Sequence, residues 1–217
     1  MSETQPPDRV PPQAAYRDHP FDQSRYQVRL EWGVEGFARL APADVVVLVD
    51  VLGLSSAAIH AVEIGTTLRA DAEPAATALV DAAGRSGALV LVGGIRNAGA
   101  VAAGVLAEQE RRGARTSVAL IAVGEPTAGA ALRFTVEDLL GAGAVIAALA
   151  DRGIDHSSPE AAAACESFRG LRRATRHLLT ASGSGRSLAD GVDDVHAAAA
   201  ADASNAVPVL RDGHFAG

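Results

Sequence analysis

One carboxylate stands where an apolar run meets a turn, a position suited to chemistry. Asp50 follows VVVLV, and the turn VLGLSS with Ser55 and Ser56 comes directly after it. A carboxylate in this place can ligate Mg²⁺ through one oxygen, act as a nucleophile, or accept hydrogen bonds from the next turn. The two serines lack a G-x-S-x-G motif, so they do not predict a hydrolytic nucleophile. The residues alone leave all three roles of Asp50 open.

Two adjacent acids offer the same kind of oxygen ligand. Glu137 and Asp138 lie in FTVEDLL, after Thr135 and at the start of a predicted helix. Thr135 with Asp138 three residues later is a near match to a capping box, and acids in a first helical turn suit the helix dipole. Capping alone can therefore explain both acids. Carboxylate oxygens are also the ligands that Mg²⁺ prefers, so a metal site stays an alternative.

The segment GGIRN, residues 93–97, combines flexible backbone with a cation and an amide. Its glycines allow close backbone approach, Arg96 supplies a guanidinium, and Asn97 opens a predicted helix. That set would suit an anion. A glycine-rich turn with a capping Asn explains the same letters without a ligand. The six histidines show no metal-ligand spacing.

The elements that must position these residues alternate between strand and helix. Apolar runs predict buried strands at 44–51, 87–94 and 117–126, and an alternating run predicts a half-buried strand at 26–33. Helices are predicted at 55–65, 73–87, 97–113 and 134–149. Short strands are predicted at 66–70 and 206–215, the latter with a turn at Asp212 and Gly213. The spacing predicts an α/β fold with a mainly parallel sheet and helices on both faces. Ligands bind such sheets beyond the carboxyl ends of the strands, where the candidate residues fall.

Length and composition favour one domain acting on a small ligand. Residues 1–25 are polar and Pro-rich and predict a disordered tail, and residues 26–217 predict a single α/β domain. The net charge of −7 and the lack of a basic run argue against a nucleic-acid partner. A few local cations would still hold a small anionic substrate.

Residue usage excludes further classes of chemistry. The single cysteine, Cys165, excludes an intramolecular disulfide and a cysteine-rich metal site. Lysine is absent, which excludes Schiff-base chemistry and a lysine-bearing P-loop. The N-terminus lacks a signal-peptide layout, and no apolar run is long enough to span a bilayer. We therefore expect a cytoplasmic protein with no membrane partner, and a homo-oligomer is compatible with the sequence.

Four blocks of the chain, in order, resemble the 2-phosphosulfolactate phosphatase family, the ComB-like proteins. The blocks are RLEWGVEGFARLAPADVVVLVDVLGLSSAAIHAVEIG, LVGGIRNAGAVA, LRFTVEDLLGAGAVIAAL and SGSGRSLADGVDDVHAAAAADASNAVPVL. The first is similar to a family segment in which a strand ends in Asp-Val-Leu, and the third to its Glu-Asp block. The resemblance implies the fold of that family over nearly the whole chain from Tyr26 onward.

The resemblance also implies an activity. Members of the family are Mg²⁺-dependent hydrolases that remove phosphate from 2-phosphosulfolactate, giving sulfolactate on the route to coenzyme M. A metal-assisted phosphomonoester hydrolysis with Mg²⁺ as cofactor is thus implied here. Asp50 and Glu137 are implied as catalytic residues, and Asp138 joins them as a metal ligand. The positions implied for substrate binding are Ser55, Ser56 and Asn97.

Two departures from the family pattern favour a shortened and divergent member. Gly53 stands where the family usually has Arg, and Arg96 is a replacement cation by position only. Residues 66–92 also lack the family's Gly-Glu-Arg, Gly-Asn-Ser-Pro and Thr-Thr-Asn-Gly-Thr segments. The alternative interpretation is a catalytically inactive relative that binds an anion or serves in assembly. A nucleotide-binding α/β protein is a weaker interpretation, because no G-x-G-x-x-G or P-loop is present.

Overall fold

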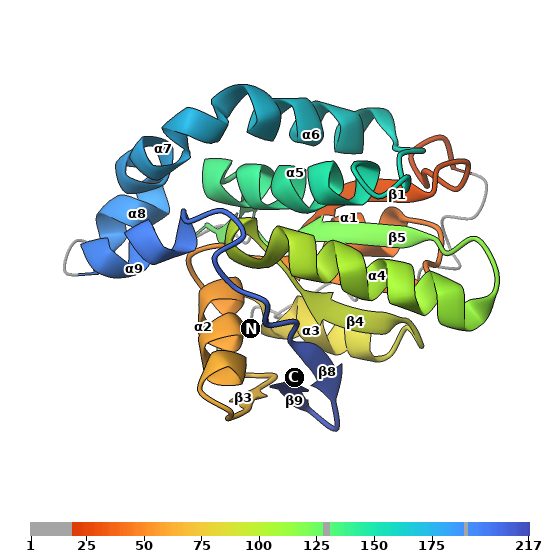
Figure 1. The fold of residues 1–217 in the computed structure, drawn as a ribbon, viewed down its shortest axis with the longest axis horizontal. Coiled ribbons are helices and arrows are strands. Elements are labelled where there is room, and N and C mark those ends of the chain that lie inside the picture. The colour runs from red at the N-terminus through yellow and green to blue at the C-terminus, as the bar shows by residue number, and fades with distance from the viewer. Residues whose placement is uncertain (1–18, 128–130, 189–190) are drawn as a thin grey trace, which may run out of the picture.

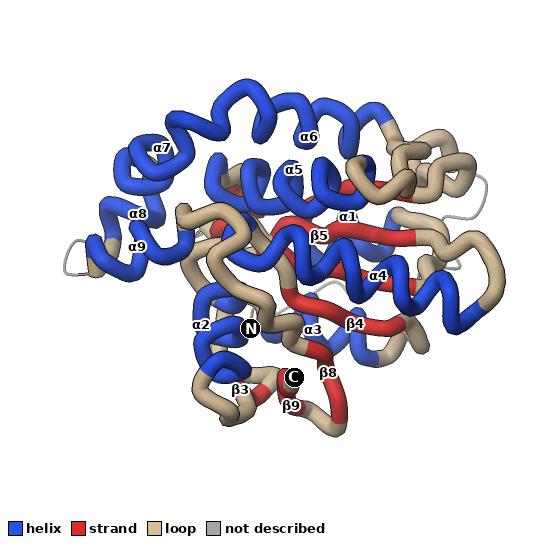
Figure 2. The backbone as a smooth tube through the Cα atoms, viewed as in Figure 1, coloured by secondary structure: helices blue, strands red, loops and turns tan. Residues whose placement is uncertain are grey.

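A seven-stranded sheet forms the centre of the molecule in the computed structural model, which describes residues 19–127, 131–188 and 191–217 (Figure 2). In spatial order its strands are β1 (Val28–Trp32), β5 (Val118–Ala122), β2 (Val45–Val49), β4 (Leu89–Val92), β8 (Val209–Arg211), β9 (His214–Ala216) and β3 (Leu68–Arg69). The first four strands are parallel, and the last three extend the sheet antiparallel. The predicted mainly parallel α/β sheet is therefore confirmed.

Helices cover both faces of this sheet. One face carries α1 (Gly33–Arg39), α2 (Leu54–Glu63) and α3 (Thr77–Gly84), and the other carries α4 (Ala98–Arg112) and α5 (Val136–Ala150). Figure 1 shows α6 (Pro159–Leu171) lying along the outer side of α5. The chain then continues through α7 (Thr175–Ala181), α8 (Gly183–Ser187) and α9 (Val192–Ala198). Short elements complete the fold: η2 (Ile95–Asn97), η3 (Arg172–Ala174), and the small hairpin of β6 (Glu125–Pro126) and β7 (Leu132–Arg133).

Side-chain alternation along β2 explains why that strand reads as continuously apolar. Val45, Val47 and Val49 pack into the cluster under α4 and α5, whereas Val46 and Leu48 pack into the cluster under α1, α2 and α3. Successive side chains of a strand point to opposite faces, so a strand covered on both sides needs an apolar residue at every position. The apolar run before Asp50 is therefore a strand that is covered on both faces of the sheet.

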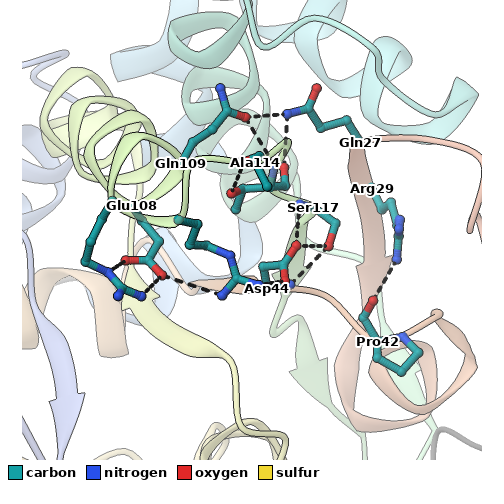
Figure 3. Close-up of polar contacts among 11 residues, drawn as sticks. Gln27, Arg29, Pro42, Asp44, Glu108, Gln109, Ala114 and Ser117 are labelled. Carbon is teal, nitrogen blue, oxygen red and sulfur yellow. Dashed lines mark hydrogen bonds and ion pairs between the residues drawn. The ribbon is translucent and has the colours of Figure 1, made fainter.

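A polar network fixes the opposite, N-terminal edge of the sheet (Figure 3). The Asp44 carboxylate accepts hydrogen bonds from the backbone N–H and the hydroxyl of Ser117, both at 2.8 Å, and pairs with Arg112. Burial disfavours the charged form of Asp44, but the Ser117 hydrogen bonds and the Arg112 charge outweigh it and lower the pKa. This network joins the residues that enter β2 and β5, so it holds the two strands in register at that edge.

The boundary of the predicted N-terminal tail differs from the prediction. Residues 1–18 of the predicted tail lie outside the described residues, but residues 19–25 are not a separate tail. Gln23 is buried, and its side chain exchanges hydrogen bonds with the backbone N–H and C=O of Leu30. At the C-terminal end, the turn at Asp212 and Gly213 that the sequence predicts is confirmed: it joins β8 to β9 in a hairpin, and its φ values of 47° and 76° suit a tight turn. Among the described helices, none combines the length and apolarity needed to cross a membrane.

Candidate functional site

The neighbouring strands β2 and β5 define a crevice at the carboxyl edge of the sheet. They run parallel, with Val49 beside Ala122 at their ends. The helix that follows β2 packs on one face of the sheet, and the helix that follows β5 packs on the other. A crevice opens where connections leave adjacent strands in opposite directions, and ligands of open α/β sheets bind at such switch points.

A cavity of about 650 Å³ lies at this switch point. It is lined by residues from the turn after β2, the loop before α3, the β6–β7 hairpin, the first turn of α5, and α8. These residues are Asp50, Leu52, Gly53, Glu73, Ala75, Gly124, Glu125, Arg133, Phe134, Thr135, Val136, Glu137, Asp138, Ser182, Gly183, Ser184, Ser187 and Leu188. The structure thus brings the three acids predicted as a site to one cavity.

Asp138 ties together the elements that surround the cavity. Its carboxylate accepts hydrogen bonds from the N–H of Val51 at 2.8 Å and of Gly124 at 3.0 Å. The Thr135 hydroxyl donates to the same carboxylate at 2.8 Å. Thr135 precedes α5 without a side-chain cap hydrogen bond, so the capping box that the sequence suggests is not formed, and the hydroxyl serves Asp138 instead. With a side chain only 2% exposed, Asp138 fastens the ends of β2 and β5 to the start of α5.

Burial and neighbouring charge weaken the acidity of two carboxyl groups here. Burial raises the pKa of Asp138 to about 8, and the charge of Asp50 adds to this increase. The three hydrogen bonds that Asp138 accepts act in the opposite direction and lower the pKa. Burial also raises the pKa of Asp50 to about 6, where the Leu54 N–H opposes the shift and the charges of Glu73 and Glu125 add to it. Negative charge is therefore concentrated in the cavity and is costly without a counter-charge.

Asp50 serves both as a turn anchor and as a lining residue. Its Oδ2 accepts a hydrogen bond from the Leu54 N–H at 2.8 Å, which anchors the start of α2. The carboxylate lies against the Cα of Gly53, where a Cβ would come within 2.9 Å of the Asp50 Cγ. Any side chain at position 53 would overlap the carboxylate as it now lies. Glycine at this position is therefore coupled to the orientation of Asp50.

Among the three acids predicted as a site, Glu137 differs from Asp50 and Asp138 in its hydrogen bonding. Its side chain is only 3% exposed and lines the cavity, yet it accepts no hydrogen bond from any described residue. Among the described residues, no buried side-chain oxygen or nitrogen lacks a hydrogen-bond partner, so the Glu137 oxygens face the open space of the cavity. The Glu137 carboxylate is therefore available to a ligand that supplies positive charge or hydrogen-bond donors.

The three acids do not form a ready-made metal cluster. Across residues 19–127, 131–188 and 191–217, no group of three or more His, Cys, Asp or Glu side chains is placed to hold a metal ion. The carboxylate of Asp138 is already occupied by three donors. Mg²⁺ in proteins commonly takes only one or two carboxylates and completes its shell with water and phosphate oxygens. Asp50 and Glu137 fit that pattern, whereas Asp138 fits a supporting role.

The serines predicted for substrate binding lie away from the cavity. The Ser55 hydroxyl accepts from the Asp50 N–H at 3.0 Å and donates to the Gly93 carbonyl at 2.7 Å. The Ser56 hydroxyl donates to the Val51 carbonyl at 2.7 Å. Neither serine lines the cavity. Their hydroxyls instead fix the turn that carries Asp50, so the prediction of substrate contact is corrected for both.

Asn97 and Arg96 are likewise placed elsewhere. The Asn97 side chain is fully buried, accepts from the Gly94 N–H at 3.0 Å, and donates to the carbonyls of Val92 and Ala206. Arg96 pairs with Glu63 at 3.0 Å. Neither residue lines the cavity. Arg96 instead lines a separate, much smaller pocket with Ser55 and Ser56, and the Asn97 amide joins β4 to the C-terminal segment. The anion site at residues 93–97 stays a prediction, apart from the main cavity.

The sequence predictions missed the cation of the cavity. Arg133, in β7, is the one Arg among the described lining residues, and it forms no ion pair with any of the described acids. Its guanidinium lies beside Gly183, and three hydroxyls from the neighbourhood of α8 line the same cavity: Ser182, Ser184 and Ser187. The sequence SGSGRS, which contains α8, belongs to the fourth block that resembles the family, so the sequence did point to that segment. Nothing in the spacing around Arg133 pointed to the cavity.

The fold and the cavity define an α/β protein with an acid-lined ligand site at the switch point of a parallel sheet. Residues 74–213, well over half of the chain, match the family described as 2-phosphosulpholactate phosphatase. The chain belongs to this family, which confirms the resemblance. The matched range contains Arg133, Glu137 and Asp138, whereas Asp50 and Gly53 precede it. A search of curated proteins found no match.

Proposed function

We propose that the chain is a Mg²⁺-dependent phosphatase that hydrolyses 2-phosphosulfolactate, or a related small 2-phospho-hydroxy acid, to the hydroxy acid and phosphate. Membership of a phosphatase family supports the reaction class. The observation that carries the proposal is Glu137, a carboxylate 3% exposed that faces the cavity without a partner. A divalent cation would supply the positive counter-charge that the Glu137 carboxylate lacks.

Two acids of the cavity would hold the cation. Asp50 and Glu137 are the carboxylates with capacity for it, and Asp138 would keep the turns that carry them in place. When bound, Mg²⁺ neutralises phosphoryl oxygens and stabilises the charge that develops during hydrolysis. These roles keep Asp50 and Glu137 as the catalytic pair, and they give Asp138 a positioning role in place of ligation.

The remaining polar groups would bind the phosphate. Arg133 offers a planar guanidinium suited to two phosphate oxygens. The hydroxyl of Ser184 would donate to the same group, whereas the hydroxyl of Ser182 already donates to the Leu179 carbonyl at 2.9 Å. In the reaction, water adds to phosphorus, the ester P–O bond breaks, and the leaving oxygen gains a proton. The proton that the attacking water loses is the one that the leaving oxygen gains, so the step balances with Asp50 acting as a cation ligand.

The test is release of inorganic phosphate from 2-phosphosulfolactate with Mg²⁺, compared with the same assay in EDTA. We expect Glu137→Gln to lower kcat/KM by about 100-fold or more, because a charge that acts in the transition state is lost. Arg133→Gln should raise KM, since the phosphate loses its guanidinium. Arg96→Gln is the matched control, because Arg96 is paired with Glu63 away from the cavity, and it should retain wild-type turnover.

A catalytically inactive, anion-binding relative is the second candidate. Gly53 supports it, since the family's usual Arg is absent from the turn that carries Asp50. The same assay separates the two candidates. Absence of Mg²⁺-dependent phosphate release, together with a phosphate-induced rise in Tm that Arg133→Gln abolishes, would favour the inactive relative.

A further inference from the structure

The hairpin of β6 and β7 carries Arg133, yet it is a weak element by itself. Each strand has two residues, all of them exposed, and the two strands form a small sheet of their own. A two-stranded hairpin without further packing is at best marginally stable in water. The place of Arg133 in the cavity therefore depends on contacts that the hairpin makes with the rest of the molecule.

No acid fixes the guanidinium of Arg133. Glu125 lies directly opposite Arg133 in the hairpin, and both residues line the cavity. In the part of the chain that the structure describes, however, no ion pair joins Arg133 to Glu125 or to another acid. The guanidinium lies beside Gly183 instead, where an added Cβ would be 4.0 Å from its Nη2 atom. The backbone that carries Arg133 must therefore set the position of this cation.

The residues before and after Arg133 both pack on the end of β1. The side chain of Leu132 lies over Gly33, where an added Cβ would come within 3.0 Å of the Leu132 Cδ2 atom. The ring of Phe134 packs on the half-buried indole of Trp32, with ring centroids 4.9 Å apart. Aromatic pairs attract one another at such separations. Two consecutive residues, Trp32 and Gly33, thus hold the neighbours of Arg133 on either side.

The local backbone makes the end of β1 a firm support for the hairpin. Gly33 has a φ of 62°, a conformation that favours glycine, and its missing Cβ leaves room for Leu132. Gly124, with a φ of 68°, leaves room for the same side chain from the other direction. Trp32 itself pairs with Ala122 at the end of β5. The support therefore belongs to the same sheet edge from which the hairpin departs.

We infer that Trp32 is a positioning residue for the anion-binding part of the cavity. Among the described residues, Trp32 is not one of those that line the cavity, so it acts through Phe134. Its indole holds Phe134, and with it the adjacent Arg133, where the guanidinium can meet a phosphate group. The inference rests on the proposed function for the role of Arg133 toward phosphate, and it adds the residue that keeps Arg133 in place.

The experiment measures the Kd of inorganic phosphate by calorimetry in the presence of Mg²⁺. We expect Trp32→Ala to raise this Kd about tenfold, because a displaced guanidinium loses its paired hydrogen bonds to the anion. Trp32→Phe should restore the Kd to within about twofold of the wild type, since a phenyl ring still packs on Phe134. Trp32→Leu keeps an apolar side chain at this half-buried position, and it tests the same ring contact if the alanine variant does not fold.

Tyr26→Ala is the matched control for the loss of an aromatic contact. Tyr26 packs on His156 with ring centroids 5.5 Å apart, and neither residue lines the cavity. This variant should bind phosphate as the wild type does. Reduced phosphate affinity in Tyr26→Ala equal to that in Trp32→Ala would overturn the inference, because the effect would then be general to the fold.

A double variant separates positioning from a general structural role. Trp32→Ala combined with Arg133→Gln should bind phosphate no more weakly than Arg133→Gln alone, because the position of residue 133 matters only while the guanidinium is present. A residue that merely stabilises the fold would lower the affinity in both backgrounds. Additive losses in the double variant would therefore overturn the inference.

The remaining outcomes also decide between the inference and the proposed function. Wild-type phosphate affinity in Trp32→Ala, no recovery in Trp32→Phe, or no phosphate binding by the wild type would overturn the inference. Non-additive losses of phosphate binding, without Mg²⁺-dependent phosphate release from 2-phosphosulfolactate, would sustain the inference and reject the phosphatase. Phosphate release by the wild type, with undiminished phosphate affinity in Trp32→Ala, would sustain the phosphatase and reject the inference.

Discussion

At the scale of single residues, Asp50 shows how a structural and a functional role share one side chain. One carboxylate oxygen anchors the Leu54 N–H, and the group also lines the cavity. Burial favours its neutral form, with the charge of Glu73 adding to the effect, so its pKa is raised to about 6 from 3.8. A group with a raised folded-state pKa contributes stability that is fully present below its unfolded pKa. That stability is lost as the pH rises through the folded pKa.

Asp50→Asn should therefore stabilise the metal-free protein at neutral pH. Asparagine keeps an acceptor for the Leu54 N–H and does not ionise. We expect the free energy of unfolding of the variant to match the wild type near pH 4 and to exceed it at pH 7 by at most about 3 kcal/mol. Urea unfolding in EDTA at both pH values measures the difference. A variant less stable than the wild type at pH 7 would show that ionisation of Asp50 does not destabilise the folded protein.

Asp44→Asn provides a control of opposite sign for that experiment. The pKa of Asp44 is lowered, because Ser117 and Arg112 outweigh the cost of its burial. Its stabilisation is therefore present above the ordinary carboxyl pKa and is lost as the pH falls through the lowered value. The variant should be less stable than the wild type at pH 7, by about 1 kcal/mol. The deficit should shrink in acid.

Gly53 should control the orientation of Asp50. Gly53→Ala would place a Cβ against the Asp50 carboxylate and force it from its present position. We expect the affinity for Mg²⁺ to fall by about tenfold or more, since ligand placement is disturbed. Gly94→Ala is the matched control at a neighbouring strand end, where the nearest atom to an added Cβ is 3.6 Å away. Equal metal affinity in the two variants would argue against the coupling.

Sequence reasoning located the acids of the site better than their partners. A strand-end Asp50 and a helix-start Glu137 meet because parallel strands end at one edge of a sheet, which periodicity can predict. The partners of Asn97 could not be foreseen, because its amide reaches Ala206, 109 residues away. Arg133 reaches the cavity through the β6–β7 hairpin, whose register depends on tertiary packing.

At the scale of elements, α5 is held from one side by a close contact between its middle and α6. An added Cβ at Gly143 would come within 2.8 Å of the Ala164 carbonyl carbon and 2.9 Å of the Phe168 Cβ. The two helices therefore approach closely at this glycine. Helix α6 packs on α5 and supports it from the side opposite the sheet (Figure 1). The apolar periodicity of the sequence predicted α5. The close approach at Gly143 could not be predicted in the same way, because it depends on which residues of α6 lie opposite.

Gly143→Ala should accordingly destabilise the fold. Overpacking in a close helix contact costs about 1 to 3 kcal/mol. Gly170→Ala is the matched control, because an added Cβ there meets no atom within 4 Å and alanine raises helix propensity by up to about 1 kcal/mol. Thermal or urea unfolding should give shifts of opposite sign for the two variants. Stabilisation by both changes would show that α5 and α6 can separate without cost.

At the scale of the whole molecule, an acidic chain concentrates negative charge at one switch point of its sheet. The net charge is −7, and five of the acids line the cavity. The sheet is held at its N-terminal edge by the Asp44 network and at its carboxyl edge by Asp138. A cation at the carboxyl edge would relieve the repulsion there, so metal binding should stabilise the native state.

The most direct test of this account is calorimetric titration of Mg²⁺ in the presence of inorganic phosphate. We predict binding near one ion per chain for the wild type and at least about tenfold weaker binding for Glu137→Gln, because the buried carboxylate is a ligand. Glu110→Gln, which removes an exposed acid outside the cavity, should bind as the wild type does. Undiminished Mg²⁺ binding by Glu137→Gln, or no binding by the wild type, would contradict the assignment of Glu137 and the cavity.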